Sequence, residues 1–117
     1  PVYRIAIDSH DLDSSSGEAT NTNTLVIGSY DRARSTGQGG DGTSQILRVN
    51  ATQYTKDTDE DKHVGRSTRF RIWCRRINNN PLNGASYEVL VFESFVPLAL
   101  QAELEKNIAI YNEIDLN

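Results

Sequence analysis

The chain has 117 residues and a mass of 13.1 kDa, which is the size of a single domain covering residues 1–117. Its net charge of -4 and pI near 5.1 argue against a polycation that coats nucleic acid over its whole surface, but allow a local basic patch. No apolar run approaches the roughly 20 residues that a membrane-spanning helix needs, and no signal peptide is recognisable. Pro1 is what removal of an initiator Met would leave, so we expect a complete cytosolic product.

The pattern of apolar and polar residues predicts five strands. Apolar runs predict strands at residues 2–7, 24–30, 44–54, 66–76 and 87–96. Polar or glycine-rich segments predict loops at residues 8–23, 31–43, 55–65 and 78–86. The first loop is either a long hairpin connection or a poorly ordered tip, and the second, with four glycines, is predicted to be flexible.

Pro97 ends the last strand, and helical spacing follows over residues 98–114. Leu100, Leu104 and Ile108 recur every four residues, as on one face of an amphipathic helix. Strands followed by a terminal helix predict an α+β fold. We expect an antiparallel β-sheet of about five or six strands, formed by an N-terminal hairpin plus a meander and followed by a C-terminal α-helix. The last strand is apolar on both faces, which in a small domain indicates contact with a second subunit.

The strand at residues 66–76 is the most informative part of the chain, because five of its eleven residues are arginine in an acidic protein. Alternation places Phe70, Ile72 and Cys74 on an apolar face, where Cys74 would be a buried free thiol in a reducing compartment. The strand at 44–54 alternates in the same way. The opposite face of these two strands collects eight polar, basic and aromatic residues. They are Arg48, Asn50, Thr52, Tyr54, Arg69, Arg71, Trp73 and Arg75.

A single helix that covers the apolar face would leave the face with these eight residues open. Guanidinium groups bind phosphates, and aromatic rings stack on unpaired bases, so the open face would suit single-stranded RNA. The alternative is a solvated sheet face whose arginines pair with neighbouring carboxylates.

No pattern in the sequence predicts catalytic residues, a cofactor or a metal site. Asp57–Asp61 has alternating carboxylates, but Lys62 stands where a calcium loop needs glycine. Gly37–Gly42 lacks the Lys-Ser/Thr pair of a phosphate-binding loop. His10 and His63 lie in polar loops, with no nucleophile or metal-ligand pattern beside them. We therefore expect a protein that is not an enzyme.

The order of elements resembles that of the coat proteins of single-stranded RNA bacteriophages. Tyr87–Leu98 is similar to that family's last strand, in which an acidic residue precedes an apolar-Pro-apolar step into the helix. Arg69–Trp73 is similar to the family's basic alternating strand, and residues 48–54 are similar to the polar face of the strand before it. From about residue 44 onward the resemblance rests on the residue pattern. In the earlier part of the chain it rests only on the order of elements.

The resemblance implies an interlocked homodimer in which each subunit's helix crosses the partner's sheet. It also implies an icosahedral shell whose inner sheet face binds the RNA genome, including an operator hairpin as a translational repressor. The protein would be made in the bacterial host cytoplasm and act in the virion, without a membrane partner. Two other functions stay open: a small RNA- or ssDNA-binding module that does not assemble, and a phage decoration or adaptor protein.

Overall fold

A computed structural model describes residues 3–7, 10–14, 23–61, 88–92 and 94–116. The elements within these ranges are β1 (Arg4–Ile7), β2 (His10–Asp13), β3 (Val26–Tyr30), the 3-10 turns η1 (Arg32–Arg34) and η2 (Thr36–Gln38), β4 (Gln45–Val49), β5 (Thr52–Lys56) and α1 (Leu98–Tyr111). The predicted α+β class is confirmed for this part of the chain. The described strands form two antiparallel sheets of two and three strands, whereas the sequence predicted one sheet.

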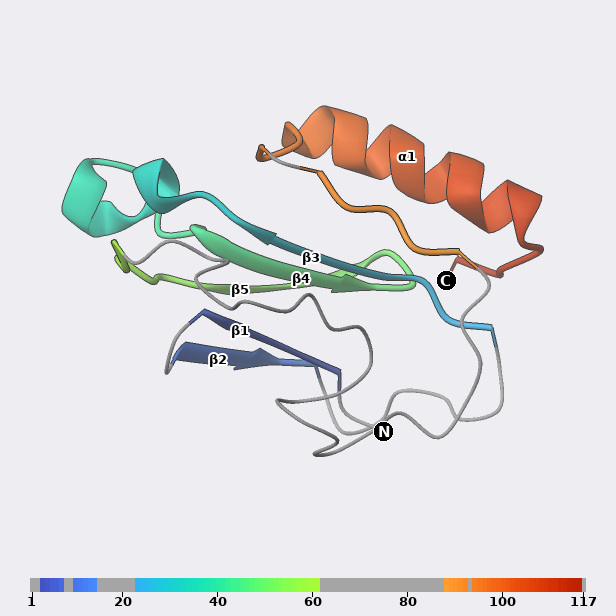
Figure 1. The fold of residues 1–117 in the computed structure, drawn as a ribbon, viewed down its shortest axis with the longest axis horizontal. Helices are drawn as coiled ribbons and strands as arrows, with labels where there is room; N and C mark the ends of the chain where they lie inside the picture. The colour runs from blue at the N-terminus through green and yellow to red at the C-terminus, as the bar shows by residue number, and fades with distance from the viewer. Residues whose placement is uncertain (1–2, 8–9, 15–22, 62–87, 93, 117) are drawn as a thin grey trace.

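The described residues are arranged in three layers (Figure 1). The middle layer is the sheet with strand order β3-β4-β5. Helix α1 lies over one face of this sheet, and the β1–β2 hairpin lies against the other. On the hairpin side the Ile5 side chain of β1 packs directly on Gly28 of β3, where an added Cβ would lie only 2.5 Å from Ile5 Cγ2. Among the described residues, no helix has the length and apolar character needed to cross a membrane.

Side chains of β4 alternate between the two covered faces, as the pleat of a strand requires. Leu47 and Val49 point to the hairpin, where they form a buried core with Leu12 of β2. Four half-buried residues pack around this core: Tyr3, Ile5, Val26 and Tyr54. Because β4 is the central strand of this sheet, four of its five residues are buried and the fifth is half-buried.

The residues predicted as one strand at 44–54 form a β-hairpin, so this prediction was wrong. β4 and β5 pair antiparallel, with Val49 opposite Thr52 and Leu47 opposite Tyr54. The chain reverses through Asn50 and Ala51, whose φ angles are 45° and 71°. Two consecutive positive φ angles characterise the two-residue turn that matches the twist of paired strands. The Asn50 carboxamide also fixes the turn, because Oδ1 accepts a hydrogen bond from the Leu25 amide at 2.9 Å.

Two further predictions need correction. Residues 10–13, expected in a polar connection, form β2, in which Asp13 pairs with Arg4 of β1. The 31–43 loop remains a connection, but it contains two short 3-10 helices and side-chain hydrogen bonds such as that from Arg34 to Thr43. Residues 88–92, expected within the last strand, have no regular secondary structure. The predicted strand at 66–76 lies outside the described residues.

Helix α1 begins directly after Pro97, as predicted, and ends at Tyr111 rather than near residue 114. Its buried positions are Gln101, Glu105 and Ala109, which recur every four residues and face the sheet. Of the apolar stripe predicted from the sequence, Leu100 is 58% exposed, and Leu104 and Ile108 are half-buried beside the buried positions. The helix therefore contacts its own sheet through a mainly polar stripe.

Candidate nucleic-acid interface

Arg48, expected on the open face, lies beneath helix α1. Its Nη2 is 2.8 Å from Glu105 Oε1, and its Nε is 3.2 Å from Glu105 Oε2. The side chains are only 16% and 3% exposed, respectively. The hairpin turn explains the error, because residues 48 and 54 would share a face of a continuous strand but lie on opposite faces of a hairpin with this register.

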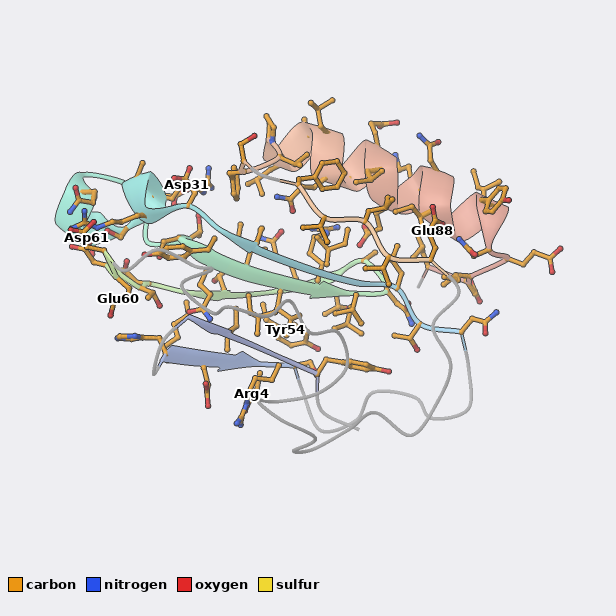
Figure 2. The ribbon with its side chains drawn as sticks, viewed as in Figure 1. Arg4, Asp31, Tyr54, Glu60, Asp61 and Glu88 are labelled. Atoms are coloured by element: carbon orange, nitrogen blue, oxygen red, sulfur yellow. The ribbon has the colours of Figure 1, made fainter. Side chains whose placement is uncertain are left out.

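The three residues that follow Arg48 in the predicted set do not form a surface with it. Asn50 is part of the turn and bonds to Leu25. Thr52 is exposed at the start of β5. Tyr54 packs against the core between the three-stranded sheet and the hairpin (Figure 2). The other four predicted RNA-binding residues lie outside the described residues. They are Arg69, Arg71, Trp73 and Arg75.

The sheet face opposite the helix is not open in the described part of the chain, which is a second correction. The β1–β2 hairpin covers it, and a buried glutamine joins the two layers. Gln45 Nε2 donates to the carbonyl oxygens of Ile5 and His10 at 3.2 and 3.0 Å. Gln45 Oε1 accepts from Thr58 Oγ1 at 2.8 Å, so both ends of the carboxamide are bonded. A fully buried polar group needs such partners, and here they fix the hairpin on the sheet.

Every lysine and arginine among the described residues bonds to a carboxylate or a carbonyl oxygen. The pairs are Arg4 with Asp11 and Asp13, Arg32 with Asp59 and Asp61, Arg34 with Asp41, Arg48 with Glu105, Lys56 with the Asp11 carbonyl, and Lys106 with Glu103. A hydrogen bond from Arg32, and a smaller contribution from a hydrogen bond from Gln38, hold the pKa of Asp59 below its usual value. The Thr43 hydroxyl and amide, with a smaller contribution from Arg34, do the same for the pKa of Asp41. The four arginines are thus paired with carboxylates within the subunit, whereas Lys56 keeps its charge beside a neutral carbonyl oxygen and Lys106 forms only an exposed pair.

The charges of the chain are divided sharply along the sequence. Residues 62–87 contain six of the 12 lysines and arginines and none of the 16 aspartates and glutamates. The rest of the chain has the other six cations and all 16 carboxylates. Since the six cations outside this segment all have partners, the positive charge available to a phosphate backbone is concentrated in residues 62–87.

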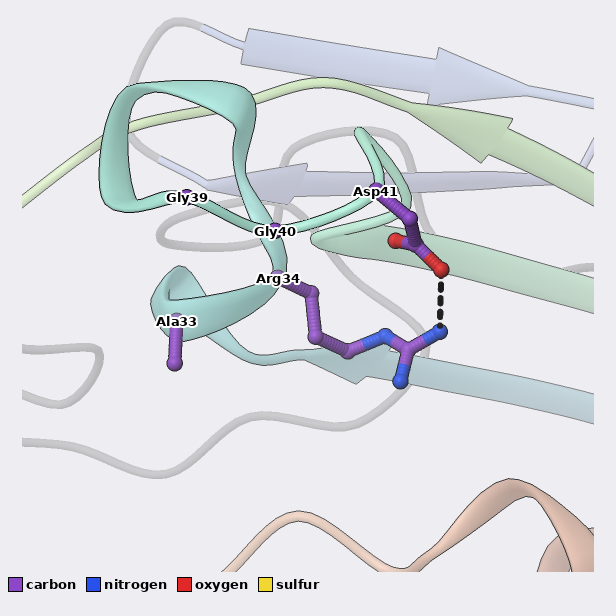
Figure 3. Close-up of a pocket in the computed structure, with 5 residues that line it drawn as sticks. All are labelled: Ala33, Arg34, Gly39, Gly40 and Asp41. Carbon is purple, nitrogen blue, oxygen red and sulfur yellow. Dashed lines mark hydrogen bonds and ion pairs between the residues drawn. The ribbon is translucent and has the colours of Figure 1, made fainter.

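Arg34 lies in a small polar hollow that the sequence did not predict (Figure 3). The hollow has a volume of about 440 Å³ and is lined by Ala33, Arg34, Gly39, Gly40 and Asp41. The Arg34 guanidinium bonds to Asp41 Oδ2 at 3.2 Å and to Thr43 Oγ1 at 2.8 Å, and lies 5.7 Å from the centre of the Phe95 ring. The bonds stabilise the loop and occupy Nε and Nη2 of the guanidinium, and the Asp41 carboxylate beside it disfavours an incoming anion.

Among the described residues, a group of large apolar side chains at residues 89–92 and on α1 is exposed. Val89, Leu90, Val91 and Phe92 are 43–68% exposed. Their segment runs antiparallel to α1, because Glu88 bonds to Asn112 near the end of the helix and Val96 bonds to Gln101 near its start. On the helix itself, Leu100, Ile110 and Tyr111 are exposed as well. The two-sided apolar pattern of residues 87–96 was the sequence signal for this surface.

Among the described residues, no group of three histidine, cysteine, aspartate or glutamate side chains could hold a metal ion. Comparison with known proteins gives no relative: no family model matches the chain, and neither a curated protein nor a solved structure does.

Proposed function

We propose that the chain is the coat protein of a single-stranded RNA bacteriophage, which dimerises and assembles into an icosahedral shell in the virion. The observation that carries the proposal is the exposed apolar segment Val89–Phe92. Four consecutive large apolar side chains that are 43–68% exposed are unfavourable, because full burial of such a side chain is worth about 1.5–3 kcal/mol and roughly half of that is still to be gained. A second copy of the chain that covers this segment would remove the cost.

The orientation of α1 supports self-association independently. The helix turns Gln101, Glu105 and Ala109 to its own sheet and leaves Leu100 and Ile110 in solvent. A helix in a monomer normally buries its apolar side. Leu104 and Ile108 are half-buried, and the apolar residues that stay exposed at the two ends of the helix fit a subunit whose helix also packs against a partner.

The division of charge supports RNA as the ligand of the assembled shell. In the described part of the chain every arginine is paired with a carboxylate, and the part as a whole is acidic. Residues 62–87 contain six unopposed positive charges in the sequence, together with Trp73. We propose Arg69, Arg71 and Arg75 as phosphate contacts and Trp73 as a base-stacking residue, and no longer include Arg48.

The proposal can be tested by expressing three variants in bacteria beside the wild type. The wild-type chain should elute as particles, visible by negative-stain electron microscopy, with a strong nucleic-acid absorbance. Val91→Asp should abolish the particles, because a carboxylate would be buried in the contact. Arg69→Glu combined with Arg71→Glu should leave dimers but remove the RNA. Ala33→Asp, an exposed change in η1, should assemble normally.

The alternatives give different results in the same experiment. A non-assembling RNA- or ssDNA-binding module would stay small and would shift an oligonucleotide in a salt-sensitive way. A decoration or adaptor protein would show the same elution volume and the same nucleic-acid absorbance when Arg69 and Arg71 are reversed in charge. A wild-type chain that remains monomeric and forms no particles contradicts the coat-protein proposal.

A further inference from the structure

The side of helix α1 that faces away from the sheet carries a stripe of exposed residues. The helix forms the outermost of the three layers (Figure 1). The residues of this outer stripe follow one another at intervals of three or four positions. They are Leu100, Glu103, Asn107 and Ile110. At 3.6 residues per turn, this spacing places all four opposite the buried stripe that contacts the sheet.

The outer stripe has the same order of chemistry from either end. Its two ends are apolar, because Leu100 is 58% exposed and Ile110 is 78% exposed. Its middle is polar, with Glu103 and Asn107 on the stripe and Lys106 at its side. Lys106 Nζ lies 3.7 Å from Glu103 Oε1, and both side chains are about two-thirds exposed. A surface that reads the same in both directions is suited to contact with a copy of itself.

An antiparallel copy of α1 would match this stripe residue by residue. If a two-fold axis crosses the helix at the level of Glu105, Leu100 lies opposite the partner's Ile110. Glu103 then lies opposite the partner's Asn107 and beside the partner's Lys106, so the charges of the two copies are complementary. A parallel copy would instead place Glu103 against the same carboxylate of its partner, which is unfavourable.

The charge of the outer stripe argues against other occupants. Glu103 and Lys106 carry opposite charges, so the stripe has no net charge that would attract a phosphate backbone or an anionic lipid surface. Two 14-residue helices alone bury less than the roughly 1,200–2,000 Å² of a stable interface. The exposed segment Val89–Phe92, which runs beside α1, supplies further apolar area for a contact between copies.

We propose that α1 pairs antiparallel with α1 of a second copy through the outer stripe. In this register Leu100 packs on the partner's Ile110, and Glu103 pairs with the partner's Lys106. The pairing rests on the self-association in the proposed function and adds the helix face, the direction and the register through which two copies meet.

Engineered disulfides in the full chain test the register. In a Cys74→Ser background, Leu100→Cys combined with Ile110→Cys should form covalent dimers on mild oxidation. The yield should be at least about tenfold higher than for either single variant. The reason is distance, because positions 100 and 110 are about 15 Å apart along a helix, whereas a disulfide needs Cα atoms within about 7 Å. A disulfide within one chain, or between two copies of the same cysteine, is therefore not possible in this register.

Charge reversal in the double-cysteine chain tests the pairing of Glu103 with the partner's Lys106. Glu103→Lys gives each copy two positive charges, and Lys106→Glu gives each copy two negative charges. Each variant alone should cross-link about threefold to tenfold less, because four like charges then meet. An equal mixture of the two should recover the yield. Since both chains lack the internal Lys106–Glu103 pair, recovery comes only from contact between copies.

The matched control is Ala33→Lys with Thr52→Lys, which adds the same charge on exposed residues outside α1 and should leave the yield unchanged. Equal cross-linking of the single and double cysteine variants, or a mixture of charge variants no better than each alone, would overturn the pairing even if the wild type forms shells. Dimers linked only between positions 100 and 110, without particles, would support the pairing and contradict the coat-protein proposal. A strictly monomeric chain would overturn both.

Discussion

Arg48 of β4 and Glu105 of α1 are 57 residues apart in the sequence and form a two-point ion pair beneath the helix. A third contact, from Arg48 Nη1 to Gln53 Oε1 at 2.8 Å, directs the guanidinium along the sheet. The pair fixes the position of the helix on the sheet where apolar contact is scarce, because the buried helix stripe contains only one apolar residue, Ala109.

Removing one member of this pair should destabilise the fold strongly. Glu105→Gln leaves the Arg48 guanidinium buried without its counter-charge, and we expect the free energy of unfolding to fall by about 3 kcal/mol. Urea denaturation followed by circular dichroism measures the change. Lys106→Gln is the matched control, because it breaks the exposed Lys106–Glu103 pair next to it and should cost less than about 1 kcal/mol.

Replacing both members should restore much of the stability. In Arg48→Met with Glu105→Leu, no buried charge remains and the volume is nearly kept. A double variant as unstable as Glu105→Gln alone would show that the pair is not the main contact between helix and sheet.

The turn between β4 and β5 offers a stabilising substitution. Ala51 has a φ of 71°, a left-handed conformation that costs a residue with a Cβ roughly 1–2 kcal/mol. Ala51→Gly should therefore raise the free energy of unfolding by about 1 kcal/mol, measured by thermal denaturation. Ala102→Gly in α1 should do the opposite, since glycine lowers helix stability by about 1 kcal/mol. If both variants raised or both lowered the free energy of unfolding, the left-handed conformation of Ala51 in the turn would be contradicted.

Acid should release the 31–43 loop. The pKa of Asp59 is lowered because Arg32 and Gln38 donate hydrogen bonds to its carboxylate. A carboxyl group whose pKa is lowered by folding contributes stability above its unfolded value of about 3.9, and this contribution is lost as the pH falls through the folded value. Loop amides should thus lose protection below about pH 4.

The carboxyl carbon shift of Asp59, followed by nuclear magnetic resonance, checks this directly. Arg32→Gln should move the pKa of Asp59 up toward its ordinary value. Arg4→Gln should leave it unchanged, because Arg4 pairs with Asp11 and Asp13 on the hairpin. If the pKa of Asp59 were the same in Arg32→Gln as in the wild type, the contact between Arg32 and Asp59 would be refuted.

Local sequence patterns predicted the parts of the fold that local chemistry determines. Pro97 marked the start of α1 because it cannot continue a strand, and the alternation of Leu47 and Val49 identified β4. The turn at Asn50 was missed because Ala51 stands where a two-residue hairpin strongly favours glycine. Strand β2 was missed because its sequence, His10–Asp13, is polar apart from Leu12 and so shows no apolar alternation.

The candidate site was harder to predict because it depends on contacts between distant residues. Nothing near Arg48 in the sequence indicates that Glu105 neutralises it, so an arginine on an alternating strand suggested a ligand-binding role. The same holds for Arg32, whose partners Asp59 and Asp61 follow after a complete hairpin. Composition did indicate the concentration of positive charge in residues 62–87, because that property needs no tertiary contact.

Sedimentation velocity of nuclease-treated protein from expressing bacteria, recorded at protein and nucleic-acid wavelengths, tests most directly whether the chain forms a shell around RNA. We predict one fast boundary that absorbs at both wavelengths, since enclosed RNA is protected from nuclease. Protein that sediments only as a slow monomer, with no nucleic-acid absorbance, would contradict the proposal that the chain is a coat protein.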